Sequence, residues 1–513
     1  MNNRNYLKII FLVSILILSS CTNQLDEELE LSTTSENIDY SSQAGAFNAL
    51  IGSYQKFQDM GWEQIPLLSL RGDDVNAGGL GDQAGFSDTD RFVYDNNYWM
   101  YNQLWDSWFQ KILQITTQIE QLEKFRKGGV DSAKIDQYIA ECKTLRAFLT
   151  LQLSRTFGAV FNVESADQTK LVVRSKDETM QWVSSQIDEA TPFLLDMRPN
   201  ERTDLKGGVT KYTALAIKAM AKLELKDYQA VADATGMIIK SGKFDLYSSY
   251  YSLFKTPGKL ANENLLEIQY SDLGVASGGG SINHLFAFYG PQDWTPAVSG
   301  ASNGWGFYEP SLKYIKFMLN RGEKERLETS VLFTNRGIDQ IKADPLYVTL
   351  PSWITNTTRD GDLIKDYSRA LFASGKHYLP SKQLTPGRTD YGSNKNYIVT
   401  RYSEVLLMYA EALTRGATGS AGSAADAVTL VRQRAGLGAV SSVTSQQVMD
   451  EKYAELGMEW GIRYFDMVRL EQTAELSYDG RTYTAVKKYL PYPLAQLDKS
   501  YVLKEYVQNH PNP

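Results

Sequence analysis

The spacing of hydrophobic residues is the feature that most constrains the fold of this 513-residue chain. From Ala44 onward they recur at three- and four-residue steps, which places them on one face of an α-helix. The same spacing returns over residues 98–125, 133–157 and 180–195. These segments predict a mainly α-helical protein.

Two further segments are typical of helical hairpins, in which two short helices touch through small residues. Residues 212–223 are rich in alanine, Lys226-Asp227-Tyr228 interrupts the helical pattern, and residues 230–239 resume it. Residues 402–413 and 424–434 repeat this arrangement. Each pair resembles a tetratricopeptide-type hairpin, a unit that buries its apolar face by stacking on its neighbours.

Between the two hairpins lies a region, about 271–400, that is rich in turns and aromatic residues. Gly278-Gly279-Gly280, Gly290-Pro291 and several tryptophans and tyrosines alternate within residues 271–308. A long loop inside a compact protein is usually functional or disordered, and disordered segments normally lack aromatic residues. We therefore expect residues 271–308 to carry function. Residues 330–400 are also rich in turns, and their sequence does not predict particular helices or strands.

The N-terminus predicts export and lipid attachment. Arg4 and Lys8 precede an apolar run that is too short to span a bilayer comfortably, and Leu18-Ser19-Ser20-Cys21 closes it. This ending resembles a bacterial lipobox, so we expect residues 1–20 to be a lipoprotein signal peptide and Cys21 to carry acyl chains such as palmitate. An ordinary secretory signal with an incidental cysteine is the alternative. Residues 21–43 then form an extended tether, and residues 44–513 form the body, held on the membrane by about 0.8 kcal/mol per buried methylene.

Composition argues against several classes of site. The chain has 53 Lys and Arg against 60 Asp and Glu, a net charge of −7, and no basic block that indicates nucleic acid. Beyond Cys21 only Cys142 remains, so there is no disulfide framework, and we expect Cys142 to be a buried small residue. His284, His377 and His510 lie far apart and form no metal-ligand spacing, so we expect neither a metal nor a cofactor.

Three patterns could suggest chemistry, but none has the required context. Residues 300–304 match G-x-S-x-G, yet no strand leads into the serine and no helix leaves it. An EF-hand loop counted from Asp74 would place Gly85 where a bidentate glutamate is needed. The carboxylate pairs Glu404/Glu411 and Glu455/Glu459 lie on predicted helices near several arginines, which favours structural ion pairs over glycosidase acid and base groups. We therefore expect no catalytic residues.

Aromatic residues make up 12% of the chain, including 31 Tyr and 9 Trp. Such rings mostly fill cores, which is the alternative for each tryptophan, but they also suit sugars because a pyranose presents apolar C–H faces to flat rings. The segment from Arg71 to Asn76 offers donors and acceptors to vicinal hydroxyl groups, with a solvated acidic turn as the alternative. The candidate ligand contacts are the rings of Trp294, Trp305, Tyr289, Trp353 and Trp99, and the polar groups of Arg71, Asp73, Asp74 and Asn76.

The C-terminal third resembles the signature of a known family. The resemblance is carried by Tyr397–Leu413, Val431–Gly436 and Glu451–Arg469, and by the ending Tyr489–Pro493. One departure is Tyr492, where an aliphatic residue is usual. Because the hairpins and the lipobox also occur in the expected order, the chain is similar to the SusD/RagB family of Bacteroidetes outer-membrane lipoproteins.

This resemblance implies a SusD-like fold with tetratricopeptide-type hairpins plus a variable, loop-rich part that carries the ligand site. It implies a non-enzymatic lipoprotein, exposed on the cell surface, that captures an oligosaccharide or polysaccharide as the lid of a SusC-like TonB-dependent outer-membrane transporter. Because the signature residues are shared across different ligands, we expect Arg401, Glu411, Arg463 and Asp466 to belong to the scaffold. A peptide-capturing lid of the RagB type is the alternative, and a soluble glycoside hydrolase is a third class. The aromatic-rich loop favours sugar, since peptides are gripped largely through backbone hydrogen bonds.

Overall fold

The structure of this chain is a computed structural model that describes residues 38–60, 64–79, 83–277, 280–388 and 392–510. The expected signal peptide, Cys21 and most of the expected tether lie outside the described residues. Within the described ranges, no helix combines the length and the apolar character needed to cross a membrane.

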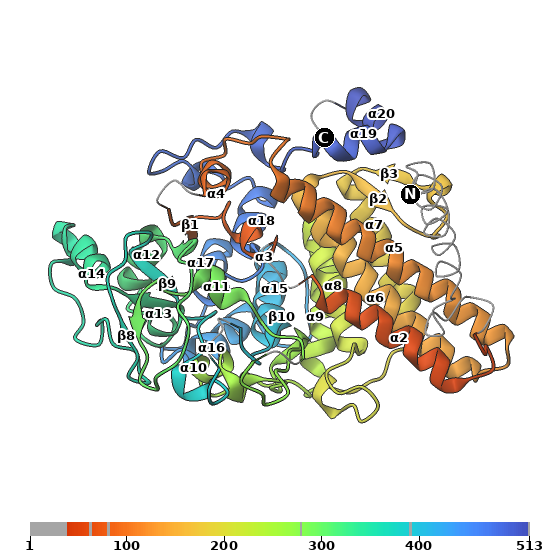
Figure 1. The fold of residues 1–513 in the computed structure, drawn as a ribbon, viewed down its shortest axis with the longest axis horizontal. Helices are drawn as coiled ribbons and strands as arrows, with labels where there is room; N and C mark the ends of the chain where they lie inside the picture. The colour runs from red at the N-terminus through yellow and green to blue at the C-terminus, as the bar shows by residue number, and fades with distance from the viewer. Residues whose placement is uncertain (1–37, 61–63, 80–82, 278–279, 389–391, 511–513) are drawn as a thin grey trace, which may run out of the picture.

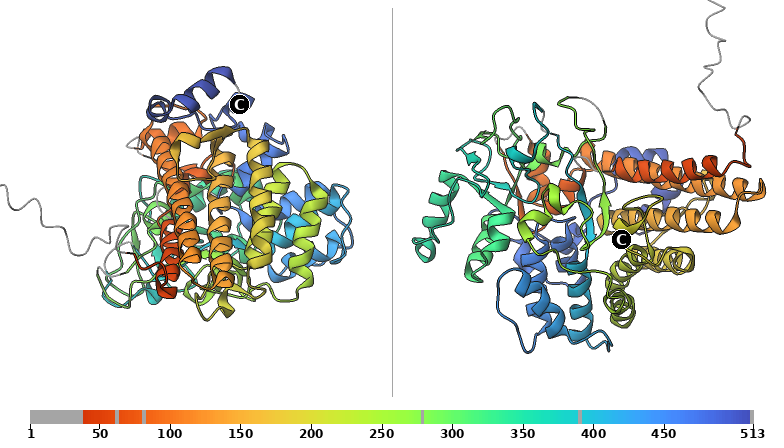
Figure 2. Two further views of the ribbon diagram at one scale, coloured as in Figure 1. Left: turned by 90° about the vertical axis from the view of Figure 1, so that its right-hand side faces the viewer. Right: turned by 90° about the horizontal axis from the view of Figure 1, so that it is seen from below.

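The helices predicted from the hydrophobic spacing form one half of the molecule, on the right in Figure 1. They pack in the order α2, α5, α6, α7, and a second view shows their axes running alongside one another (Figure 2). The predictions are confirmed, although α7 begins and ends about one turn early, and Cys142 is fully buried in α6 as expected. The bounds are α2 (Gln43–Gln58), α5 (Trp99–Lys127), α6 (Ser132–Phe157) and α7 (Lys176–Ala190).

Both predicted helical hairpins are present, and they stack on each other. The first consists of α8 (Lys211–Glu224) and α9 (Tyr228–Lys240), and the Asp227 side chain between them caps the start of α9. The second consists of α15 (Tyr402–Thr414) and α16 (Ala424–Arg434). Because α9 also packs against α15, the hairpins join into one continuous helical layer that extends the row ending at α7.

The other half of the molecule, in green and teal on the left of Figure 1, consists of short elements joined by loops. Each described strand belongs to a two-stranded antiparallel pair, and residues 271–400 also contain four α-helices that the sequence did not assign. The helices are α11 (Leu285–Tyr289), α12 (Leu312–Asn320), α13 (Glu325–Ser330) and α14 (Asn335–Lys342). The pairs are β1 (Val75–Ala77) with β6 (Tyr308–Pro310), β2 (Val160–Asn162) with β3 (Val172–Arg174), β4 (Asn264–Ile268) with β10 (Tyr397–Arg401), β5 (Trp294–Thr295) with β8 (Leu363–Ile364), and β7 (Val331–Phe333) with β9 (Phe372–Ser374).

The remaining helices lie between the two halves or against one of them. The C-terminal segment returns along the first half, where α19 packs on α5 and α20 packs on β3. The bounds are α3 (Gln64–Ser69), α4 (Ala84–Asp90), α10 (Tyr250–Leu253), α17 (Ser445–Leu456), α18 (Ile462–Arg469), α19 (Leu494–Lys499) and α20 (Tyr501–Asn509).

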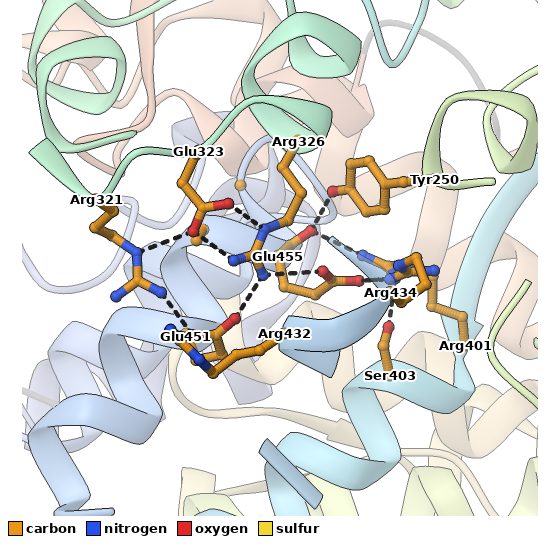
Figure 3. Close-up of polar contacts among 12 residues, drawn as sticks. Tyr250, Arg321, Glu323, Arg326, Arg401, Ser403, Arg432, Arg434, Glu451 and Glu455 are labelled. Atoms are coloured by element: carbon orange, nitrogen blue, oxygen red, sulfur yellow. Dashed lines mark hydrogen bonds and ion pairs between the residues drawn. The ribbon is translucent and has the colours of Figure 1, made fainter. Parts of the chain in front are cut away.

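A buried network of arginines and glutamates joins the loop-rich half to the second hairpin (Figure 3). Glu455 of α17 lies at its centre and accepts from Arg326 of α13, from Arg401 at the end of β10 and from Arg434 of α16. All four side chains are at most 4% exposed. Burial alone would raise the pKa of Glu455, but the three guanidinium groups hold it well below its usual range. The prediction that this glutamate has a structural role is confirmed.

The other signature residues also serve the scaffold. Glu411 receives a bidentate contact from Arg469, with both N–O distances at 2.6 Å, and Asp466 pairs with the same arginine at 2.6 Å. Glu404 differs from the expectation of an ion pair, because it accepts a hydrogen bond from Thr400 and burial raises its pKa to about 7. These carboxylates hold helices together and do not face a common ligand.

Candidate functional site

The polar residues proposed from the sequence as a hydroxyl clamp are mostly buried in the core. Asp73 is fully buried and pairs with Arg463 at 2.7 Å, and Asp74 accepts from the backbone N–H of Met458 at 2.6 Å. The guanidinium of Arg71, also fully buried, lies 4.4 Å from the centre of a tyrosine ring. The segment runs inward because it leads into β1, whose partner β6 belongs to the loop-rich half. These three side chains therefore support the scaffold in this structure instead of facing solvent.

Two of the proposed rings are buried as well. Trp294 is 4% exposed, donates from Nε1 to the carbonyl of Ser302 at 3.1 Å, and meets the Tyr378 ring edge-on. Tyr289 is 1% exposed and stacks on His377 with ring centres 3.9 Å apart. Both rings have protein on their faces, which corresponds to the core-packing alternative considered for each.

Five other aromatic side chains form a row of ring contacts that reaches the surface at both ends, and two of them, Trp99 and Trp305, were proposed from the sequence. We call this set the aromatic row; in order it consists of Trp305, Phe307, Phe86, Tyr98 and Trp99. Successive ring centres lie 5.4, 5.8, 6.4 and 6.0 Å apart. Phe86, in the middle of the row, is fully buried, Trp99 is 55% exposed, and the other three rings are partly exposed.

The row exists because three distant segments approach one another closely. Gly78 donates its N–H to the carbonyl of Phe307 at 2.8 Å, and a Cβ on this glycine would lie 2.4 Å from the carbonyl oxygen of Gly306. Gly85, in α4, lies against the ring of Tyr98, and a Cβ there would be 2.2 Å from that ring. Only glycine fits at either position without displacing the row.

Polar groups border the row on its inner side. The guanidinium of Arg369 lies 4.8 Å from the centre of the Phe307 ring and donates to the carbonyl of Trp305 at 2.8 Å. Glu309 accepts two backbone N–H groups at the start of β9, and burial raises its pKa to about 7. Asn76, opposite Glu309 in the β1–β6 pair, is partly exposed and accepts from a tyrosine hydroxyl. Flat apolar faces next to fixed polar groups suit a ligand that is both ring-shaped and hydroxylated.

The remaining proposed ring, Trp353, lies apart from the row. It is partly buried and lines a small cavity together with Tyr251 and Arg359. Sequence reasoning did not propose Phe86, Tyr98, Phe307 or Arg369. The sequence offered a hint for only two of these residues: Tyr98 directly precedes Trp99, and Phe307 follows Trp305 in the same aromatic loop.

Comparison with known proteins identifies the fold. The model of the SusD family matches residues 262–511. The chain belongs to the SusD family. A SusD-like protein from Bacteroides ovatus is 24% identical over 71% of this chain, and the alignment spans 64% of that relative's own length. SusD-like protein P2 from Formosa agariphila is 24% identical over 90% of both chains.

Solved structures of SusD-like proteins share this architecture. Surface glycan-binding protein A from Bacteroides thetaiotaomicron, solved in complex with laminarihexaose, has a TM-score of 0.73 at 22% identity and covers 89% of this chain and 97% of its own. A laminarin-binding SusD-like protein has a TM-score of 0.74 at 21% identity, with coverages of 90% and 98%. At these identities the likeness establishes the fold, mainly α as predicted.

The patterns that could suggest chemistry in this SusD-family chain have structural roles. The G-x-S-x-G serine, Ser302, lies in a loop between β5 and β6, and its carbonyl accepts from Trp294. Glu459 pairs with Arg401 and Lys376. Across the part of the chain that the structure describes, no group of three or more His, Cys, Asp or Glu side chains is arranged to hold a metal ion.

Proposed function

We propose that this chain is a glycan-binding protein of the cell surface and that its aromatic row contacts the sugar. The observation that carries this proposal is the row itself, in which two pairs of at least partly exposed rings, Trp305 with Phe307 and Tyr98 with Trp99, lie on either side of the buried Phe86. Each pair can stack on a pyranose unit, while Arg369, whose guanidinium lies against the Phe307 ring, can meet hydroxyl groups. The names of the similar solved structures, which bind laminarin or laminarihexaose, support a glucan or a related oligosaccharide as the ligand class.

The two tryptophans at the ends of the row provide the test. Stacking contributes about 1 kcal/mol per ring, so replacing Trp99 and Trp305 by alanine together should cost about 2 kcal/mol of binding, roughly a 30-fold weaker Kd. Trp99 is 55% exposed, and Trp305 is partly exposed but packs edge-on against the buried Phe288, so the double variant should fold with a modestly lower melting temperature. Trp182→Ala is the matched control, because Trp182 is partly buried on α7 and lies outside the row.

Isothermal titration calorimetry against oligosaccharide and peptide panels measures these outcomes. Binding of a glycan by the wild type and the Trp182 variant, weakened about 30-fold in the double variant, supports the proposal. Heat with peptides and none with any glycan would favour the peptide-capturing lid, and released reducing ends would indicate a hydrolase. Normal glycan binding by the double variant would place the site elsewhere.

We further propose that the body is attached to the outer membrane through acyl chains on Cys21 and covers a SusC-like TonB-dependent transporter during import. The lipobox-like sequence before Cys21 and membership of the SusD family support this arrangement. A tagged copy extracted in mild detergent should bring down a TonB-dependent β-barrel, and Cys21→Ser should release the protein from the membrane fraction. Recovery of the lipoprotein alone would count against the lid role, while membrane retention of the serine variant would count against the anchor.

A further inference from the structure

A small cavity lined by lysines lies between α10, the β4–β10 pair and the turn that follows β9. The cavity has room for about one particle of the size of a water molecule. The lining includes Lys255, Lys259, Lys376 and Lys395, together with His377. Four cationic side chains around one small cavity call for a source of negative charge.

The ammonium groups of two of these lysines are held close together by one short turn, residues 375–378. Lys255 is 1% exposed and donates to the carbonyls of Gly375 at 2.6 Å and Tyr378 at 3.1 Å. Lys395 is 6% exposed and donates to the carbonyl of Lys376, in the middle of the same turn. An ammonium has three protons, so these contacts leave one donor on Lys255 and two on Lys395.

The carboxylates that line the cavity are already engaged. Glu459 pairs with Lys376 at 2.7 Å, and that ammonium spends its other protons on two backbone carbonyls. Glu267 accepts from the side-chain amides of Asn264 and Asn396 and from a backbone N–H. Among the described residues, no carboxylate lies within ion-pair distance of the ammonium of Lys255 or Lys395.

The other titratable groups supply little negative charge: Asp360 acts on Lys255 from beyond ion-pair distance and accepts from the Tyr251 hydroxyl. Burial and the neighbouring lysines keep the pKa of His377 well below its usual value, so this side chain is neutral, and its Nδ1 lies 2.7 Å from the Ser374 hydroxyl. Burial also lowers the pKa of Lys255 to about 7 and that of Lys395 well below its usual value. A buried charge without a partner is costly, so the two ammonium groups either lose a proton or gain a counter-ion.

We propose that this cavity is a binding site for a small monovalent anion of the halide class, such as chloride, held by the ammonium groups of Lys255 and Lys395. The small size of the cavity favours a halide over sulfate, phosphate or a carboxylate, and the three unused N–H donors are the contacts that a halide takes. Contact of the Lys255 ammonium with the Tyr251 ring, 4.7 Å from its centre, also favours the charged form of the lysine. A bound anion would join the segment after α10, which carries Lys255, to the segment before β10, which carries Lys395, and this inference is independent of the proposed glycan binding.

Melting temperature at constant ionic strength is the first test. Sodium chloride is exchanged stepwise for sodium gluconate, whose anion is too large for the cavity. At a chloride concentration a hundred times the Kd, Tm should be higher by roughly 3 °C than in gluconate, and the increase should saturate. Bromide should act like chloride. Lys395→Met should remove this dependence, whereas Lys342→Met, at an exposed position on α14, should keep it.

A Tm that is the same in chloride and gluconate, or a chloride dependence that persists in Lys395→Met, would overturn the proposal. If the methionine variant does not fold, crystals of the wild-type protein soaked in bromide give an independent answer. An anomalous peak between Lys255 and Lys395 supports the site. A cavity without that peak at saturating bromide means that these lysines are neutral and that no anion is bound.

Discussion

Removing the carboxylate of Glu455 should be among the most destabilising single changes in this protein. The side chain is fully buried and contacts Arg326 at 3.2 Å and Arg401 at 2.5 Å, with Arg434 on the same oxygen as Arg401. Breaking a buried ion pair by removing one partner costs about 3 to 5 kcal/mol, because the other charge remains buried. Each of the three arginines keeps at least one other carboxylate, so we expect Glu455→Ala to lose about 3 kcal/mol.

Urea unfolding followed by circular dichroism measures this loss as a lower midpoint with an unchanged slope. Glu471→Ala is the control, because Glu471 is 82% exposed and its pair with Lys226 is a surface contact that contributes less than about 1 kcal/mol. A domain is stable by only about 5 to 15 kcal/mol, so the difference between the two variants should be obvious. If the free energy of unfolding of Glu455→Ala were within about 1 kcal/mol of the wild-type value, the network in Figure 3 would not be the link between the two halves.

Two further predictions concern acid stability and the geometry of the row. Burial alone would raise the pKa of Glu224, but Lys176 and Arg155 lower it to about 2, below the value of about 4.3 in the unfolded chain. The ionised Glu224 therefore stabilises the folded state above pH ~4.3, and this contribution is lost as the pH falls toward 2. Glu224→Gln should therefore lose stability at neutral pH and show a shallower decline between pH 4 and 2 in pH-dependent urea midpoints; a parallel decline would refute this assignment. Gly85→Ala should displace the Tyr98 ring and weaken glycan binding several-fold in calorimetry, whereas Gly52→Ala, whose Cβ would meet only a glutamine side chain at 3.6 Å, should not. Equal glycan affinities for the two alanine variants would mean that Tyr98 does not belong to the binding site.

The helical layer could be predicted from the sequence because its evidence is local. The hydrophobic spacing in α2, α5 and α6, and the small residues of the hairpins, each lie within one or two helices. The short strands could not be predicted, because each is only two to five residues long and, apart from the β2–β3 pair, each pairs with a strand far away in the chain. Val75 pairs with Pro310, for example, and neither segment carries an alternating pattern long enough to show it.

The two loop tryptophans show why a ligand site is harder to predict than a helix. Trp294 and Trp305 lie in the same glycine-rich loop, and composition gives both the same claim to a sugar-stacking role. Their exposure is decided largely by partners about 60 to 85 residues later: Trp294 is covered by Tyr378 and pairs in β5 with Ile364, whereas Trp305 is held at its backbone carbonyl by Arg369 and meets Phe288 edge-on with a ring that stays partly exposed. A tryptophan whose ring is covered belongs to the core, and one whose ring stays partly exposed can offer it to a ligand. That distinction depends on contacts distant in sequence, so it becomes visible only once the chain is folded.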